Sequence, residues 1–104
     1  MVEQLKEYVY KNDLVNITVV SFWIAFNNWK TECFEDYSKR FADISLKDLV
    51  FNIKDVGIRA SAWPECDYSH VTITISVVYN GKSIGEYSYW HPLGNHDGDD
   101  FLAV

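Results

Sequence analysis

The chain has 104 residues, of which 48% are hydrophobic and 23% charged, a balance typical of one small globular domain over residues 1–104. Only 5 glycines and 2 prolines occur, which excludes a disordered or fibrous chain. The formal net charge is −6, and residues 60–104 carry one basic residue against six acidic ones, a net charge of −5. A negative field repels phosphate backbones, so we expect a basic protein partner and no direct binding of nucleic acid.

The first half of the chain has the period of amphipathic helices. Apolar residues at positions 2, 5 and 9 predict a short helix that ends near residues 12–13. From residue 15 onward, apolar residues recur in alternating steps of three and four, which predicts a long helix over about 17–43. Residues 14–20 are rich in β-branched side chains and also fit a strand, so both states stay open there. Ser45 then has the position of an N-cap for a single helical turn at 46–49.

The second half alternates with the period of β-strands. Residues 51–63 predict a first strand, with a β-bulge at Gly57 where the apolar phase shifts. Residues 64–67 predict a turn. Residues 71–77 alternate without exception and predict the second strand.

Asn80 and Gly81 predict a hairpin turn into a third strand over 83–90, and residues 101–104 predict a short terminal strand. Because helical and strand patterns occupy separate halves, we expect an α+β domain. Its N-terminal helices should pack on one face of a three- or four-stranded antiparallel sheet.

The register of the hairpin decides which side chains share a face. A two-residue turn would mix apolar and polar side chains on both faces of the sheet. A three-residue loop, with Gly81 left-handed as a bulge, pairs Ile73 with Tyr87 and makes one face apolar throughout. We therefore predict that Tyr87 and Tyr89 lie beneath the helices and that Thr72 faces away from them.

The polar outer face of this sheet carries the candidate binding residues. Trp90 lies there in the predicted register, and a tryptophan on an exposed face is typical of an interface anchor. The alternative is that residues 92–104 fold back and cover it. The other candidates for contact with a basic partner are His70, Glu86, Asp97, Asp99 and Asp100.

Motifs for catalysis and metal binding are absent from the sequence. It has no P-loop, dinucleotide-binding glycine pattern, zinc spacing or Ser-His-Asp order, so we expect no catalytic residue, metal or cofactor. Residues 95–100 begin like a calcium loop but lack its glycine and final glutamate, and they predict a turn. Cys33 and Cys66 are far apart, as in reduced cytoplasmic proteins. The apolar run 14–26 is too short to span a bilayer, so we expect a cytoplasmic protein without membrane contact.

The end of the chain, IGEYSYW at 84–90 followed by DGDDFL at 97–102, resembles the ends of small bacterial proteins that include immunity proteins of toxin systems. The resemblance covers residues 84–104, about a fifth of the chain. It implies a small intracellular bacterial protein that works by binding another protein, and it implies no catalytic residues.

These observations predict an acidic, immunity-protein-like inhibitor that blocks a basic protein partner. A phage-type inhibitor of a nuclease fits the same features. A second class is a small-molecule-binding domain or simple enzyme, with a pocket between helix and sheet lined by Trp23, Tyr87 and Tyr89. A third is a structural or oligomerising domain, and the sequence does not determine the oligomeric state.

Overall fold

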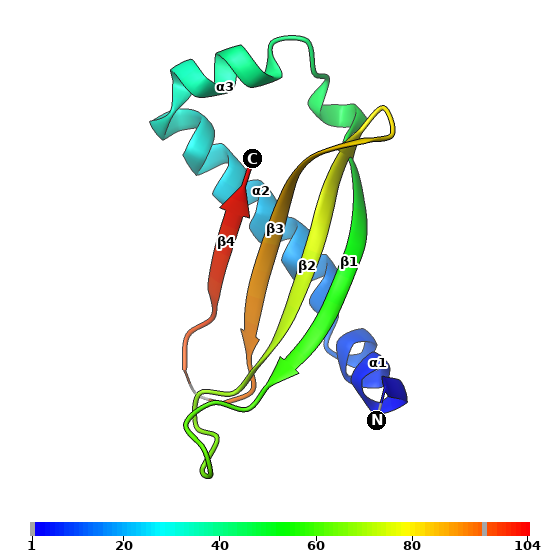
Figure 1. The fold of residues 1–104 in the computed structure, drawn as a ribbon, viewed down its shortest axis with the longest axis vertical. Coiled ribbons are helices and arrows are strands. Elements are labelled where there is room, and N and C mark those ends of the chain that lie inside the picture. Colours follow the sequence, from blue (N-terminus) through cyan, green and yellow to red (C-terminus); the bar gives the residue numbers. More distant parts are fainter. Residues whose placement is uncertain (1, 95) are drawn as a thin grey trace.

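The computed structural model describes residues 2–94 and 96–104. The helices are α1 (Val2–Lys11), α2 (Leu14–Glu32), α3 (Phe34–Phe41) and the 3-10 turn η1 (Leu46–Asp48). The strands are β1 (Val50–Arg59), β2 (His70–Tyr79), β3 (Lys82–Pro92) and β4 (Asp99–Ala103). The strands form one antiparallel sheet in the order β1-β2-β3-β4 (Figure 1). The predicted α+β class, with N-terminal helices and a C-terminal sheet, is confirmed.

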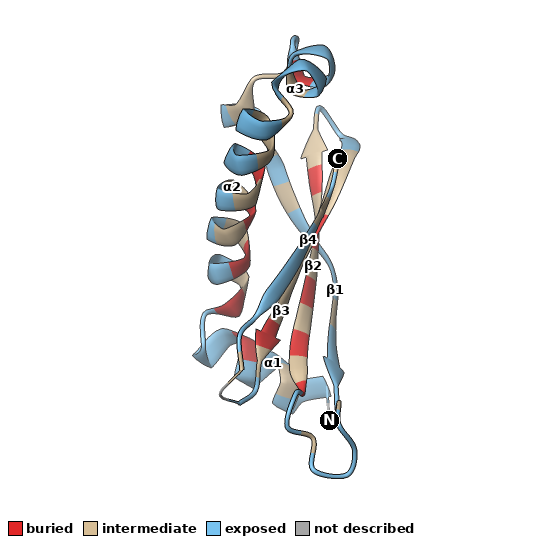
Figure 2. Cartoon of the chain, turned by 90° about the vertical axis from the view of Figure 1, so that its left-hand side faces the viewer, coloured by how far each residue is buried: buried red, intermediate tan, exposed pale blue. Residues whose placement is uncertain are grey.

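The core lies between α2 and one face of the sheet. Figure 2 shows the buried residues of α2 on the side that faces the strands. Phe22 and Phe26 are fully buried there, and the Phe22 ring meets the rings of Phe51 and Tyr87 edge to face, with centroids 5.1 and 5.8 Å apart. Each fully buried aromatic ring stabilises the fold by about 2 kcal/mol or more.

Residues 14–20 are helical, which decides the open alternative. Helix α2 begins at Leu14, directly after Asp13, whose φ of 54° is left-handed. Thr18 is β-branched, yet it is fully buried in the helix because its hydroxyl donates a hydrogen bond of 2.7 Å to the Leu14 carbonyl.

The predicted single helix over 17–43 is wrong, because the chain breaks at Cys33 into α2 and α3. Fifteen residues of straight helix would separate Phe26 from Phe41 by about 22 Å. The break brings their ring centroids to 5.3 Å and completes an aromatic cluster with Trp29. Ser45 precedes η1 as predicted, although its side chain makes no capping hydrogen bond.

The hairpin between β2 and β3 is tighter than the predicted three-residue loop. Asn80 and Gly81 are both left-handed, with φ of 51° and 77°, as in the two-residue turns that suit the twist of a hairpin. The extra residue that restores the apolar alternation is Ile84, at a bulge in β3, and not Gly81.

The predicted pairing of Ile73 with Tyr87 is therefore wrong by two residues. Ile73 pairs with Tyr89, and Ile75 pairs with Tyr87. A displacement of two residues keeps every side chain on its face, because strand side chains alternate with a period of two. Tyr87 is fully buried beneath α2 as predicted, Tyr89 is partly buried, and Thr72 lies on the outer face.

The bulge in β1 lies at Lys54 and not at the predicted Gly57. The register shifts between Ile53 and Asp55, whereas Gly57 pairs regularly with its neighbour on β2. The bulge places the Lys54 ammonium on the outer face, 2.5 Å from the Glu86 carboxylate. The strand ends at Arg59, earlier than predicted, and residues 60–69 form a loop that includes the predicted turn.

A buried polar pair joins α2 to β3. The Thr18 hydroxyl already donates to Leu14, so its oxygen accepts the 2.8 Å hydrogen bond from His91 Nε2–H. His91 is only 5% exposed, and burial lowers its pKa below the ordinary value of 6.5. The neutral imidazole is therefore the form that the folded protein holds.

This pair predicts a loss of stability in mild acid. Because the unfolded chain takes up a proton on His91 before the folded chain does, stability present above about pH 6.5 is lost as the pH falls below it. The slope from one such group reaches at most about 1.4 kcal/mol per pH unit. His91→Gln keeps an N–H donor but does not titrate. The free energy of unfolding, measured with urea between pH 7.5 and 5, should therefore fall less steeply with decreasing pH for the variant than for the wild type. Parallel curves would contradict the assignment.

Candidate functional site

Two loops converge at the end of the sheet where β1 and β3 finish. Residues 60–69 connect β1 to β2, residues 93–94 and 96–98 lie between β3 and β4, and both loops lie at the bottom of Figure 1. The Leu93 N–H donates a hydrogen bond of 3.0 Å to the Ser69 carbonyl, and the rings of Tyr68 and His96 meet with centroids 5.4 Å apart. The loops thus place carboxylates that are thirty residues apart in sequence at the same end of the sheet. We call this region the acidic end, with the carboxylates Glu65, Asp67, Asp97 and Asp99.

Hydrogen bonds within the first loop hold two aromatic side chains in solvent. The Ser69 hydroxyl donates to the Cys66 carbonyl at 2.8 Å, and the Cys66 N–H donates to the Ala62 carbonyl at 2.8 Å. Ala62 and Cys66 are both left-handed, with φ of 59° and 60°, which is costly for non-glycine residues. The resulting loop leaves Trp63 79% exposed and Tyr68 62% exposed.

A shallow depression of about 280 Å³ lies between these loops and the outer face of the sheet. Four of the six sequence-predicted site residues line it, namely His70, Trp90, Asp97 and Asp99. The rings of His70 and Trp90 meet edge to face with centroids 6.3 Å apart, and Asp99 pairs with Trp90 across β3 and β4. Arg59 supplies the basic side chain of the lining.

Trp90 is partly buried in this arrangement, and the more exposed tryptophan is Trp63. Residues 99–103 return alongside β3 as β4, and Asp99 of this strand pairs with Trp90. Sequence reasoning did not single out Trp63. Its signal was available, because it stands immediately before Pro64 in a turn that also carries Glu65.

The remaining two predicted residues, Glu86 and Asp100, are engaged elsewhere. Asp100 accepts a hydrogen bond of 2.6 Å from the Tyr87 hydroxyl on the helix side of the sheet. Burial, together with that hydrogen bond, raises the pKa of Tyr87, so the phenol stays a donor. Glu86 pairs with Lys54, and this contact raises the pKa of the Lys54 ammonium. Both carboxylates therefore make contacts between strands, Glu86 with β1 and Asp100 with β3, and neither lines the depression.

The space predicted for a small-molecule pocket is filled by side chains. Tyr87 is fully buried, and the Trp23 ring packs edge-on against Phe22 and Phe51 with centroids 5.1 and 5.8 Å apart. Among residues 2–94 and 96–104, no three His, Cys, Asp or Glu side chains are grouped so that they could hold a metal ion. Asn95, the first residue of the calcium-loop-like segment, lies outside the described residues.

No protein-family model, curated protein or solved structure matches this chain. The resemblance of residues 84–104 to immunity proteins therefore stays a prediction. In the part of the chain that the structure describes, none of the helices has the length and apolar character needed to cross a membrane.

The two tryptophans of this site should differ in their effect on stability. Trp90→Ala removes a ring packed against His70 and should lower the free energy of unfolding by about 2 kcal/mol. Trp63→Ala removes a ring that is 79% exposed and should change it by less than about 0.5 kcal/mol. Urea unfolding at pH 7 measures both. An equal loss in the two variants would show that Trp63 packs against the domain.

Proposed function

We propose that the protein is a binding module whose acidic end docks onto a basic protein and blocks it, in the manner of an immunity protein. The observation that carries this proposal is that two carboxylates, Asp97 and Asp99, and two aromatic side chains, Tyr68 and Trp90, line one depression. The loop that supplies Tyr68 also carries Glu65, Asp67 and the exposed Trp63. Charged groups guide a partner into place, and aromatic groups supply most of the binding energy.

The length of the molecule separates the acidic end from the charges of α3. The molecule measures 48 × 27 × 17 Å, and α3, in which Lys39 and Arg40 are balanced by Glu35 and Asp36, lies at the end opposite the acidic loops (Figure 1). Charges are screened over about 8 Å at physiological ionic strength. The field at the acidic end is therefore not cancelled by α3, and a basic partner meets a negative surface there.

The class of partner follows from the same charge pattern. A protein that holds nucleic acid presents a basic groove lined to receive phosphates. Carboxylates at the tip of a narrow domain match such a groove, so a nuclease or a related nucleic-acid enzyme is the partner of choice. A toxin and a phage target are both of this class, and the genes beside this one distinguish them. The module itself binds neither nucleic acid nor a membrane in this proposal.

Neutralising the acidic end should slow association. The variant Glu65→Gln, Asp67→Asn, Asp97→Asn, Asp99→Asn should lower the association rate constant about tenfold at low salt, because steering depends on the local field. A matched control neutralises four exposed carboxylates far from these loops, with Glu32→Gln, Glu35→Gln, Asp36→Asn and Asp43→Asn.

Affinity capture from the source cells, with the wild-type protein as bait, supplies a partner for stopped-flow measurements with both variants. The proposal requires a basic partner, a rate that falls as salt rises, and a selective loss in the first variant. A partner that both variants bind at the wild-type rate would refute it.

Removing the aromatic groups should instead speed dissociation. Trp63→Ala and Tyr68→Ala should each raise the dissociation rate constant, and a hot-spot residue loses at least about 2 kcal/mol on truncation, which is about thirtyfold. Trp90→Ala should also raise the dissociation rate constant. Because this variant is less stable, its rate constant is compared under conditions in which it is fully folded. Phe34→Ala on α3 is the matched control, because Phe34 is comparably exposed at 61% and lies far from the loops. Unchanged dissociation rate constants in all three variants would contradict the proposal that these aromatic side chains supply the binding energy.

A further inference from the structure

Helix α1 does not close against the strand beside it. Its apolar side chains Val2, Leu5 and Val9 face β1, yet only Val9 is buried. On the strand, Ile53 is 51% exposed and Ile58 is 63% exposed, although both lie on the helix face of the sheet. An amphipathic helix and an apolar strand face thus stand opposite each other without filling the space between them.

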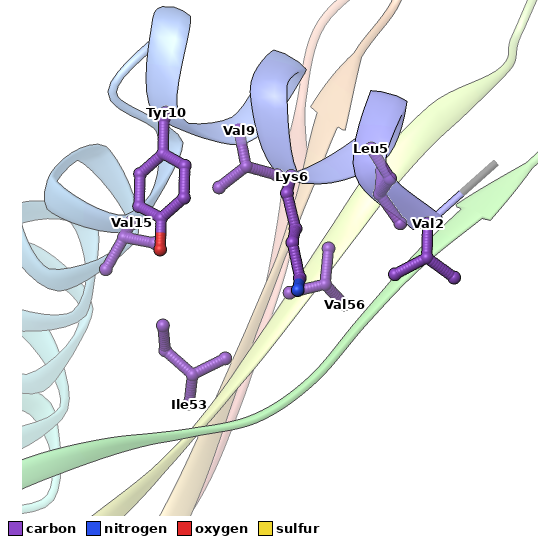
Figure 3. A pocket seen from close by; sticks show the side chains of 8 residues that line it. All are labelled: Val2, Leu5, Lys6, Val9, Tyr10, Val15, Ile53 and Val56. Atoms are coloured by element: carbon purple, nitrogen blue, oxygen red, sulfur yellow. The ribbon is translucent and has the colours of Figure 1, made fainter.

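That space forms one groove with two cavities. The first has a volume of about 230 Å³ and lies between α1, the start of α2 and β1 (Figure 3). The second has a volume of about 320 Å³ and reaches Ile58 and Leu93. Both are lined by Val2 and Leu5, so they adjoin each other along α1. Together they have the size and the apolar walls of a small-ligand site.

Two polar groups project into the first cavity. Figure 3 shows the Lys6 ammonium and the Tyr10 hydroxyl pointing from α1 into the space that Ile53 and Val56 line from below. Lys6 is the one charged residue among the eight that line this cavity. Its ammonium lies 3.6 Å from the Glu3 carboxylate, an exposed pair of the kind that contributes little. A ligand carboxylate can therefore compete for Lys6.

We propose that this groove binds an anionic amphiphile, a medium-chain fatty acid whose hydrocarbon chain lies beneath α1 and whose carboxylate pairs with Lys6. The apolar walls favour the methylene groups because burial removes them from water. The ammonium selects a negative head group over a neutral or positive one, and the Tyr10 hydroxyl donates a hydrogen bond to the same carboxylate. This site reaches the acidic end only at Leu93 and uses none of its carboxylates.

Titration of the full chain with decanoate tests the proposal, with calorimetry for affinity and methyl NMR for location. We expect saturable binding and shifted methyl signals at Leu5, Ile53 and Val56. Lys6→Met should weaken decanoate binding about fivefold, as expected for a partly exposed ion pair. It should leave binding of 1-decanol, which has the same chain without the charge, unchanged. Lys11→Met removes the same charge from a residue that does not line the groove, and it should bind decanoate like the wild type.

An apolar variant tests the chain-binding part of the groove. Ile53→Ser should weaken decanoate and decanol alike, whereas Ile24→Ser, at a 60% exposed position on α2, should weaken neither. The proposal is overturned if decanoate does not bind, if the shifted methyl groups lie on the exposed side of α2, or if Lys6→Met and Lys11→Met lose affinity equally. Lys6 is 60% exposed, so its replacement tests the site even if Ile53→Ser disturbs the fold.

Discussion

The packing of Phe22 and Phe26 against the apolar face of β2 and β3 determines the rest of this structure. Both rings are fully buried, and their partners on the sheet include Ile73, Ile75 and Tyr87, also fully buried. One helix can cover only part of a four-stranded sheet, because helices are about 10 Å wide and strands are spaced about 4.8 Å apart. Since α2 lies over the inner strands, the helix face of β1 is covered only in part, and no element within residues 2–94 and 96–104 covers the outer face. These two uncovered regions carry the groove and the acidic end.

The sequence could predict whatever depends on periodicity. Strand β2 alternates strictly, and its faces are as predicted even though the hairpin register is displaced by two residues. The displacement arises because the bulge lies at Ile84 and not at the predicted Gly81. An extra residue at either position restores the same alternation of side chains. In β1 the change of phase between Ile53 and Val56 also requires one extra residue, and periodicity alone does not say that it is Lys54.

Features that depend on contacts between distant residues were beyond the sequence pattern. The apolar stripe continues through Cys33 at helical spacing, so only the packing of Phe41 on Phe26 explains why the helix breaks there. Residues 14–20 also fitted a strand because they are rich in β-branched side chains, and only their packing in the fold shows that they are helical. Most of the candidate site was anticipated at Trp90, His70, Asp97 and Asp99. Trp63 was missed because the first strand was predicted to run to residue 63, whereas it ends at Arg59 and leaves Trp63 in a loop.

The two adjacent aspartates at the start of β4 show how one strand serves both layers. Side chains alternate along a strand, so Asp99 faces outward beside Trp90 while Asp100 faces inward, where its carboxylate accepts the Tyr87 hydrogen bond. Tyr87 is also in ring contact with Phe22. The core thus fixes β4 through Asp100, and β4 in turn fixes the position of Asp99 at the depression. The outer carboxylate is held in place by the same aromatic packing that holds the helix, so the geometry of the acidic end depends on the core beneath it.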